Sequence, residues 1–350
     1  MRVISPIAIA AALLVLAGCA GTAGQGTAGE SPSGETADTA PTAPFPTVEL
    51  DCESLIDQSV IEAAFDPSTA LVPLTFEGPG GYYELTQLGL EQSGALRCEW
   101  SDGDEVGSES YLQVSVMNDA ADDWATYSSE IALFQPTADT YGDASWQMCR
   151  DGDYPYCRID VLVGERWMSA VLGGLTSTDA AASVIEAAIA SLSEAGNADE
   201  PWETTATGPD DCEQFTSATG VVGEMDFWDR DFVPTQPVMY HAGFLAAGGM
   251  FCSWRNSFSS SSALTTEIAV LPGGGWAWER YWSAEPSDRV NREAVDDLGD
   301  AAYAACLTDG PCYATVLVGD SWLAVTVNDE STADTRPVAI EVARAAVETL

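Results

Sequence analysis

The feature that most constrains the fold is an internal duplication marked by cysteines. Residues 161–167 read VLVGERW, and residues 316–322, 155 positions later, read VLVGDSW. The cysteines of the two copies correspond in order, Cys52, Cys98, Cys149 and Cys157 to Cys212, Cys252, Cys306 and Cys312. A repeat array needs at least three units, so two copies predict a tandem pair of similar domains and exclude a solenoid.

Each copy shows the same succession of hydrophobic patterns. Helical spacing predicts helices, and strict alternation predicts strands. In the first copy we expect a helix over 55–64, strands over 96–100 and 112–116, a helix around 124–127, a hairpin over 159–171 and a closing helix over 177–192. The hairpin turns at Gly164-Glu165, because glycine takes a positive φ at the first turn position at little cost.

The predicted fold is therefore α+β, a tandem duplication of an αββαββα domain. Each domain would hold an antiparallel sheet with helices packed on one face. We expect the first domain at 48–195, a polar linker at 196–210 and the second domain at 211–350.

The duplication also limits how the eight cysteines pair. If the copies fold alike, each pairs its four cysteines internally and in the same way, which leaves three connectivities. We favour the connectivity in which the second pair of each copy flanks a tight turn and the first pair closes a longer loop. The expected disulfides are Cys52–Cys98, Cys149–Cys157, Cys212–Cys252 and Cys306–Cys312.

The N-terminal segment predicts export and lipid attachment. Residues 1–18 have the pattern of a secretory signal, with Arg2 before an apolar stretch that is short for a bilayer span. The sequence LAGC that ends at Cys19 resembles the bacterial lipobox, which implies cleavage before Cys19 and acylation of its thiol. Residues 19–47 are rich in Gly, Ala, Thr and Pro and are expected to form a disordered tether.

The charge of the chain excludes several classes of partner. Acidic residues number 55 against 12 basic ones, all of them Arg, and the net charge is −43. Such a polyanion repels nucleic acids and anionic lipid surfaces, so we expect membrane contact through the lipid anchor alone. With so many carboxylates, close pairs arise by chance, and a carboxylate-based hydrolase is only an alternative.

The segment 273–282 (GGGWAWERYW) is the most unusual cluster of aromatic residues. Trp278 and Tyr281 match Trp124 and Tyr127 of the first copy, which favours a core position for them. The other two tryptophans have no counterpart, and exposed aromatic rings can stack on a sugar or another planar ligand. The candidate ligand-binding residues are therefore Trp276 and Trp282.

No metal site or cofactor is expected from the sequence. His241 is the single histidine, and one histidine does not make a zinc site or a catalytic triad. The acidic stretches 102–105 and 151–153 suggest calcium, but both lack the spaced ligands of a calcium loop.

Each copy begins with a cysteine before a helix, continues with a Cys-x-Trp strand, and then has a cysteine followed by a Val-x-Val-Gly hairpin. A lipobox and a tether precede the first copy. This combination resembles cysteine-paired lipoprotein domains of actinobacterial envelopes, a family of uncharacterised function. It is more distantly similar to extracellular sensor domains of actinobacterial serine/threonine kinases.

The resemblance implies a non-enzymatic binding or sensing protein on the outer face of the membrane. Its partner would be a small molecule, a glycan or an envelope protein, and the alternative is a structural or docking role. A ligand is expected in the variable regions, 66–95 and 225–249, or between the copies.

Overall fold

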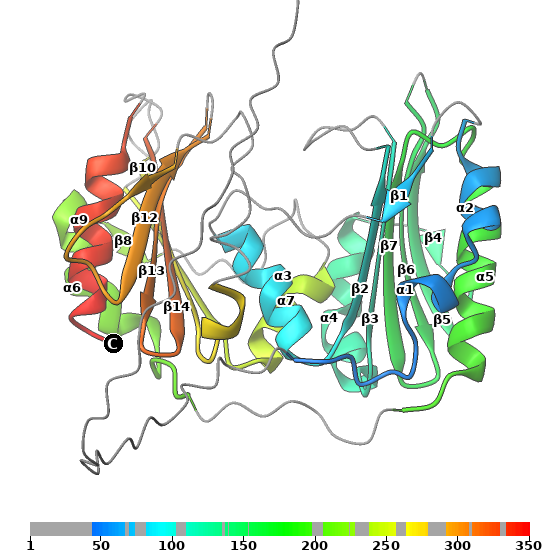
Figure 1. The fold of residues 1–350 in the computed structure, drawn as a ribbon, viewed down its shortest axis with the longest axis horizontal. Helices are drawn as coiled ribbons and strands as arrows, with labels where there is room; N and C mark the ends of the chain where they lie inside the picture. The colour runs from blue at the N-terminus through cyan, green and yellow to red at the C-terminus, as the bar shows by residue number, and fades with distance from the viewer. Residues whose placement is uncertain are drawn as a thin grey trace, which may run out of the picture. The chain divides into compact units, whose positions relative to one another are not determined.

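The computed structural model gives the chain an α+β fold with two antiparallel sheets of seven strands each (Figure 1). The predicted fold class is thereby confirmed. The structure describes residues 44–66, 70–73, 82–102, 110–134, 137–138, 140–152, 154–197, 206–223, 225–227, 238–256, 264–278, 292–307, 310–329 and 334–350. These residues belong to one compact unit, Ala40–Leu350.

The first repeat contains twelve elements among its described residues. In chain order they are α1 (Cys52–Leu55), α2 (Gln58–Ala64), β1 (Val72–Pro73), α3 (Tyr82–Gln92), β2 (Leu96–Ser101), β3 (Tyr111–Met117), α4 (Ala121–Phe134), β4 (Thr137–Ala138), β5 (Ala144–Arg150), β6 (Tyr156–Val163), β7 (Arg166–Gly173) and α5 (Ala180–Glu194). The opening helix is divided in two because the Asp57 side chain accepts the N–H of Ser59 and starts α2.

The second repeat has the same plan. Its elements are η1 (Cys212–Phe215), α6 (Thr216–Thr219), η2 (Gly220–Val222), β8 (Asp226–Phe227), α7 (Val238–Ala246), β9 (Met250–Arg255), β10 (Leu264–Leu271), β11 (Glu293–Ala294), β12 (Ala301–Cys306), β13 (Cys312–Val318), β14 (Ser321–Asp329) and α9 (Arg336–Val347). Residues 275–278 are also helical. The first sheet runs β1-β2-β3-β7-β6-β5-β4, and the second runs β8-β9-β10-β14-β13-β12-β11, which is the same order of equivalent strands.

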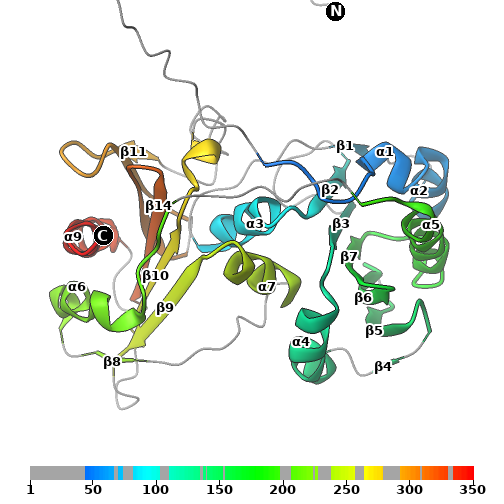
Figure 2. The ribbon, with the colours of Figure 1, turned by 90° about the horizontal axis from the view of Figure 1, so that it is seen from below.

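Helices cover both faces of each sheet, whereas the sequence predicted one covered face. In the first repeat α1, α2 and α5 pack on the outer face, where the main hydrophobic core lies. Helix α4 lies on the opposite, inner face, where Trp124 meets Trp167 edge-to-face at 5.7 Å (Figure 2). The strands are apolar on both sides, so helices pack on the inner face in addition to the one face that the sequence predicted.

The sequence did not predict helices α3 and α7, which are equivalent elements of the two repeats. Each of them packs on the sheet of the other repeat. Leu85 and Leu88 of α3 join the core of the second sheet, while Met239 and Ala242 of α7 join the inner face of the first. The repeats therefore exchange one helix reciprocally.

The two exchanged helices cross at equivalent glycines. A Cβ at Gly89 would lie 2.8 Å from the Cα of Phe244, and a Cβ at Gly243 would lie 2.9 Å from the Cα of Leu90. Both distances are far below van der Waals contact, so only glycine permits this approach at either position. The crossing is thus almost two-fold symmetric within a single chain.

The four disulfides are the expected pairs, Cys52–Cys98, Cys149–Cys157, Cys212–Cys252 and Cys306–Cys312. In each repeat one bond ties the opening helix to the strand after the exchanged helix, and the other crosses neighbouring strands of a hairpin. In the described part of the chain, no helix has the length and apolar character needed to cross a membrane.

Candidate functional site

The repeated VLVG motif forms the hairpin turn between β6 and β7. Gly164 has a φ of 61°, and its N–H donates to Oδ2 of Asp143 at 2.7 Å. In the second repeat Gly319 has a φ of 59° and donates to Oδ2 of Asp300 at 2.6 Å. Residues 142–144 and 299–301 both read Gly-Asp-Ala. In each repeat the aspartate of this motif therefore holds the Val-Gly turn through its carboxylate.

In the first repeat this turn carries an arginine that anchors the last turn of α5. The Arg166 Nε donates to Oδ1 of Asn118 at 3.0 Å. Its terminal nitrogens donate to the carbonyl oxygens of Leu192, Ala195 and Gly196 and to Oδ1 of Asn197. A cation that binds the last carbonyls of a helix caps it and complements its dipole. The guanidinium is therefore engaged by the protein itself.

A cleft of about 530 Å³ lies beside this turn. Its volume is within the range of small-ligand sites. Its lining combines apolar side chains, Val163, Ile189 and Leu192, with hydrogen-bonding ones, Asn118, Asp119, Asp143, Glu165, Arg166, Ser193 and Asn197. Arg166 and the side chains of Asn118 and Asn197 bond to one another, and Asp143 holds the turn. The main polar groups that remain in the lining for a ligand are therefore the carboxylates of Asp119 and Glu165.

The structure does not place the sequence-predicted aromatic residues in this cleft. Trp276 is 8% exposed, and its Nε1 donates to Oε1 of Gln92 at 3.0 Å. The expected exposure of Trp276 was wrong because Gln92 reaches it from the other repeat. Trp278 is in the core, as its match to Trp124 predicted, and its ring centroid lies 5.1 Å from that of Trp322. Trp282 lies outside the described residues.

His241 is a buried residue of the exchanged helix α7. Its ring meets Tyr127 edge-to-face at 6.3 Å, and burial lowers the pKa of its imidazole. This setting fits a packing role in the contact between α7 and the first repeat.

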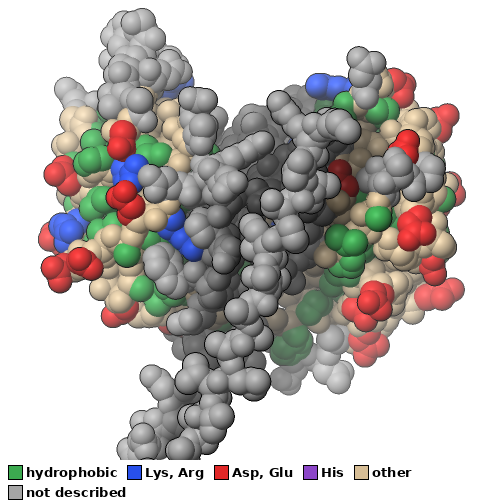
Figure 3. All heavy atoms as spheres, turned by 45° about the horizontal axis from the view of Figure 1, so that its top comes forward, with side chains coloured by type: hydrophobic (Ala, Val, Ile, Leu, Met, Phe, Trp, Pro, Cys, Tyr) green, Lys and Arg blue, Asp and Glu red, His purple; other side chains and the backbone are tan. Residues whose placement is uncertain are grey.

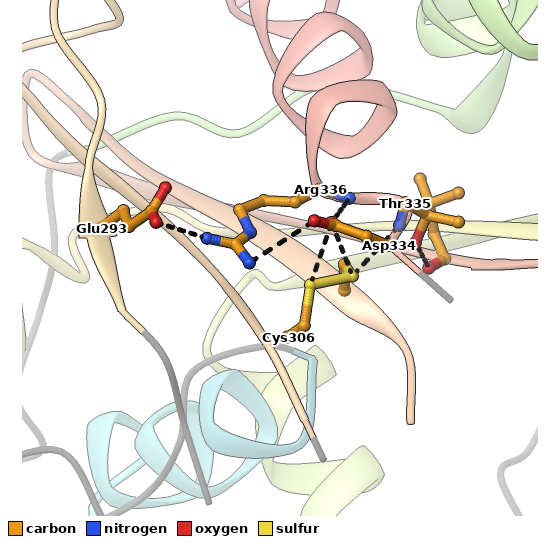
Figure 4. Close-up of a disulfide and its surroundings, with 7 residues drawn as sticks. Glu293, Cys306, Asp334, Thr335 and Arg336 are labelled. Atoms are coloured by element: carbon orange, nitrogen blue, oxygen red, sulfur yellow. Dashed lines mark hydrogen bonds and ion pairs between the residues drawn. A yellow bond between two sulfur atoms is a disulfide. The ribbon is translucent and has the colours of Figure 1, made fainter. Parts of the chain in front are cut away.

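One group of potential metal ligands occurs among the described residues. The Cys306 and Cys312 sulfurs and a carboxylate oxygen of Asp334 lie within 4.8 Å of one another (Figure 4). The two sulfurs are bonded to each other, so neither is a thiolate that could bind a metal. Instead, Asp334 pairs with Arg336 at the start of α9. Most of the acidic stretches 102–105 and 151–153, and Cys19, lie outside the described residues or at their edges.

Acidic side chains are spread over the visible surface of both repeats, with few arginines among them (Figure 3). The cleft beside the first hairpin has both acidic and apolar side chains in its lining.

No known protein family and no curated protein matches the chain. One solved structure with some likeness is the di-domain ARO/CYC StfQ from the steffimycin biosynthetic pathway. It is 9% identical, with 88% of this chain and 98% of that chain covered, at a TM-score of 0.15. Likeness at that TM-score carries no argument about the function of this chain.

Proposed function

We propose that this protein is a lipid-anchored, non-enzymatic binding or sensing module on the outer face of a bacterial membrane, and that its first repeat binds a glycan. The observation that most supports the proposal is the cleft beside the Gly164 turn. Sugars present C–H faces and hydroxyl groups. A cleft lined by apolar side chains and by carboxylates suits both.

The anchored location has separate support. Four disulfides are typical of proteins that fold outside the reducing cytoplasm. The lipobox-like sequence before Cys19 would supply the anchor, and the acidic surface suits a protein that contacts the membrane through acyl chains alone.

Glycan binding is tested with soluble fragments of bacterial envelope polysaccharides added to the purified full-length chain. Ligand binding to the native state raises the unfolding temperature. Glu165→Ala removes one carboxylate of the cleft lining and should weaken binding by about tenfold, the loss expected for a hydrogen bond to a charged group. Asp320→Ala at the equivalent turn of the second repeat is the matched control and should bind as the wild type does. Equal losses in both variants, or no shift with any glycan, would contradict glycan binding in this cleft.

The anchor is tested by metabolic labelling with a fatty acid and by membrane fractionation. We expect Cys19→Ala to abolish labelling and to release the protein from the membrane fraction. A Cys19→Ala variant that is labelled as strongly as the wild type and stays in the membrane fraction would contradict acylation at Cys19.

A further inference from the structure

The inner face of the first sheet carries a row of three polar residues, of which the second sheet keeps only one polar position. Directly paired positions on β3, β7 and β6 hold Ser115, Ser169 and Asp160. The equivalent paired positions on β10, β14 and β13 hold Ala269, Ala324 and Thr315. The same fold therefore forms with alanines where the first repeat has serines, so the fold does not require this polar row.

The row is deeply buried. Ser115, Ser169 and Asp160 are 1%, 3% and 0% exposed. Among the described residues, the Ser169 hydroxyl has no hydrogen-bond partner. A buried hydroxyl without a partner costs stability, and such a group calls for an explanation such as a bound molecule.

A cation lies next to this row. Arg158 precedes Asp160 by two residues on β6, so both side chains lie on the same face about 6.5 Å apart. Arg158 is 6% exposed, and the second repeat has Tyr313 at its position. One carboxylate oxygen of Asp160 accepts the Trp167 Nε1–H at 3.1 Å. A guanidinium has five N–H donors and a carboxylate about four acceptor positions, so each can keep a partner in the chain and still bind a ligand.

The polar row approaches solvent toward one end of the sheet. Along β6, burial decreases from Asp160 through Arg158 to the partly exposed Tyr156, and Tyr154 just before the strand is exposed. Tyr111 lies beside this end, across Gly173. Burial raises the pKa of the Tyr111 and Tyr156 hydroxyls, which keeps them protonated as hydrogen-bond donors. Tyr111 and Tyr154 pack over Gly173, so these tyrosines separate the buried row from solvent at this end of the sheet, and a ligand would enter by displacing them.

We propose that Arg158, Asp160 and Ser169 form a binding site for a small zwitterion, a molecule with one carboxylate and one ammonium group. The guanidinium would bind the carboxylate, Asp160 would bind the ammonium group, and the Ser169 hydroxyl would gain a partner. A simple anion would be repelled by a chain of net charge −43, whereas a zwitterion has no net charge. This site is independent of the cleft at the Gly164 turn.

The second repeat supplies substitutions that its fold already accommodates at these positions. The test compares the wild type with Ser169→Ala and Asp160→Thr in the full-length chain. The probes are glycine, L-alanine and D-alanine, with acetate and ethanolamine as singly charged controls, read by thermal shift and calorimetry.

We expect at least one amino acid to raise the unfolding temperature of the wild type, and acetate and ethanolamine to have no effect. Ser169→Ala should unfold at the same or a higher temperature but bind several-fold more weakly. Asp160→Thr should lose binding by at least about tenfold, the cost of a charge-assisted hydrogen bond. Ser253→Ala removes a buried hydroxyl of the second sheet and should leave binding unchanged.

Three results would overturn the proposal. The first is that no amino acid stabilises the wild type at concentrations up to about 50 mM. The second is that acetate raises the unfolding temperature as much as the amino acids do. The third is that Ser169→Ala unfolds at a lower temperature than the wild type. The last result would mean that the hydroxyl serves the fold itself. Ser169→Ala should not change glycan binding at the Gly164 cleft, so the two proposals can fail separately.

Discussion

The crossing of α3 and α7 allows a quantitative test of the fold. The perturbation is Gly243→Ala, with Gly89→Ala as its symmetric counterpart. In an ordinary helix, replacing glycine by alanine stabilises by about 1 kcal/mol. Here the new methyl groups would lie 2.9 Å from the Cα of Leu90 and 2.8 Å from the Cα of Phe244, so the sign should reverse.

The size of the effect follows from these distances. Carbon atoms in contact need about 3.5 Å, so the helices must separate by roughly 0.6 Å or bend. Each helix is also packed on the opposite sheet, so the separation disturbs two cores. Overpacking of this kind costs about 1–3 kcal/mol, and after the gain in helix propensity we expect a net loss of about 1–2 kcal/mol for each variant. The double variant should lose less than the sum, because the first methyl already separates the helices.

The assay is urea unfolding followed by tryptophan fluorescence, with thermal unfolding as a second measurement. Gly220→Ala is the control, because a Cβ there meets nothing within 4 Å and Gly220 has a φ of −56°. That control should match or exceed the stability of the wild type. If Gly243→Ala and Gly89→Ala were as stable as the wild type, the close crossing of the two helices would be refuted.

Three further predictions concern single contacts. Burial lowers the pKa of His241, so the unfolded chain binds more protons below the unfolded value of about 6.5, and stability should fall as the pH decreases from there. His241→Gln should remove that part of the pH dependence, measured by urea unfolding at neutral and mildly acidic pH. Asp300→Ala removes the acceptor of the Gly319 N–H and should cost about 1 kcal/mol by thermal unfolding, while an unchanged value would show that water replaces the carboxylate fully. Trp276→Phe deprives Oε1 of Gln92 of its donor and should cost about 1–3 kcal/mol. A double-mutant cycle with Gln92→Ala should show strong coupling, and additive losses would contradict the contact.

The parts of the fold that the sequence predicted correctly depend on local signals. The Gly164 and Gly319 turns need a positive φ, and the flanking strands alternate, so the hairpins could be recognised from short segments. The requirement that two similar copies pair their cysteines alike left three connectivities, and the tight turn between the second pair of each copy favoured the one that the structure has. Both inferences require only neighbouring residues or a comparison of the copies.

The helices that the sequence missed lack such a signal. Residues Val238–Phe244 of α7 are all buried, so the helix has no polar side that would reveal a period of 3.6 residues. Helix α3 was concealed for a related reason, since it is buried by the other repeat. Strand β5 also escaped detection because residues 144–150 do not alternate between apolar and polar.

The candidate sites could not be predicted from the sequence, because they depend on contacts between distant residues. Trp276 was expected to be exposed because it has no counterpart, yet Gln92, 184 positions away, covers it. The contrast between Ser169 and Ala324 becomes visible only when the strand register aligns the two sheets.

The reciprocal exchange of α3 and α7 has a consequence for how the molecule responds to force and heat. Neither repeat can lose its structure without stripping a helix from the inner face of the other sheet. The duplicated halves should therefore unfold together, in a single calorimetric transition, despite their separate disulfides. Tension applied to the molecule would accordingly be resisted by both repeats together.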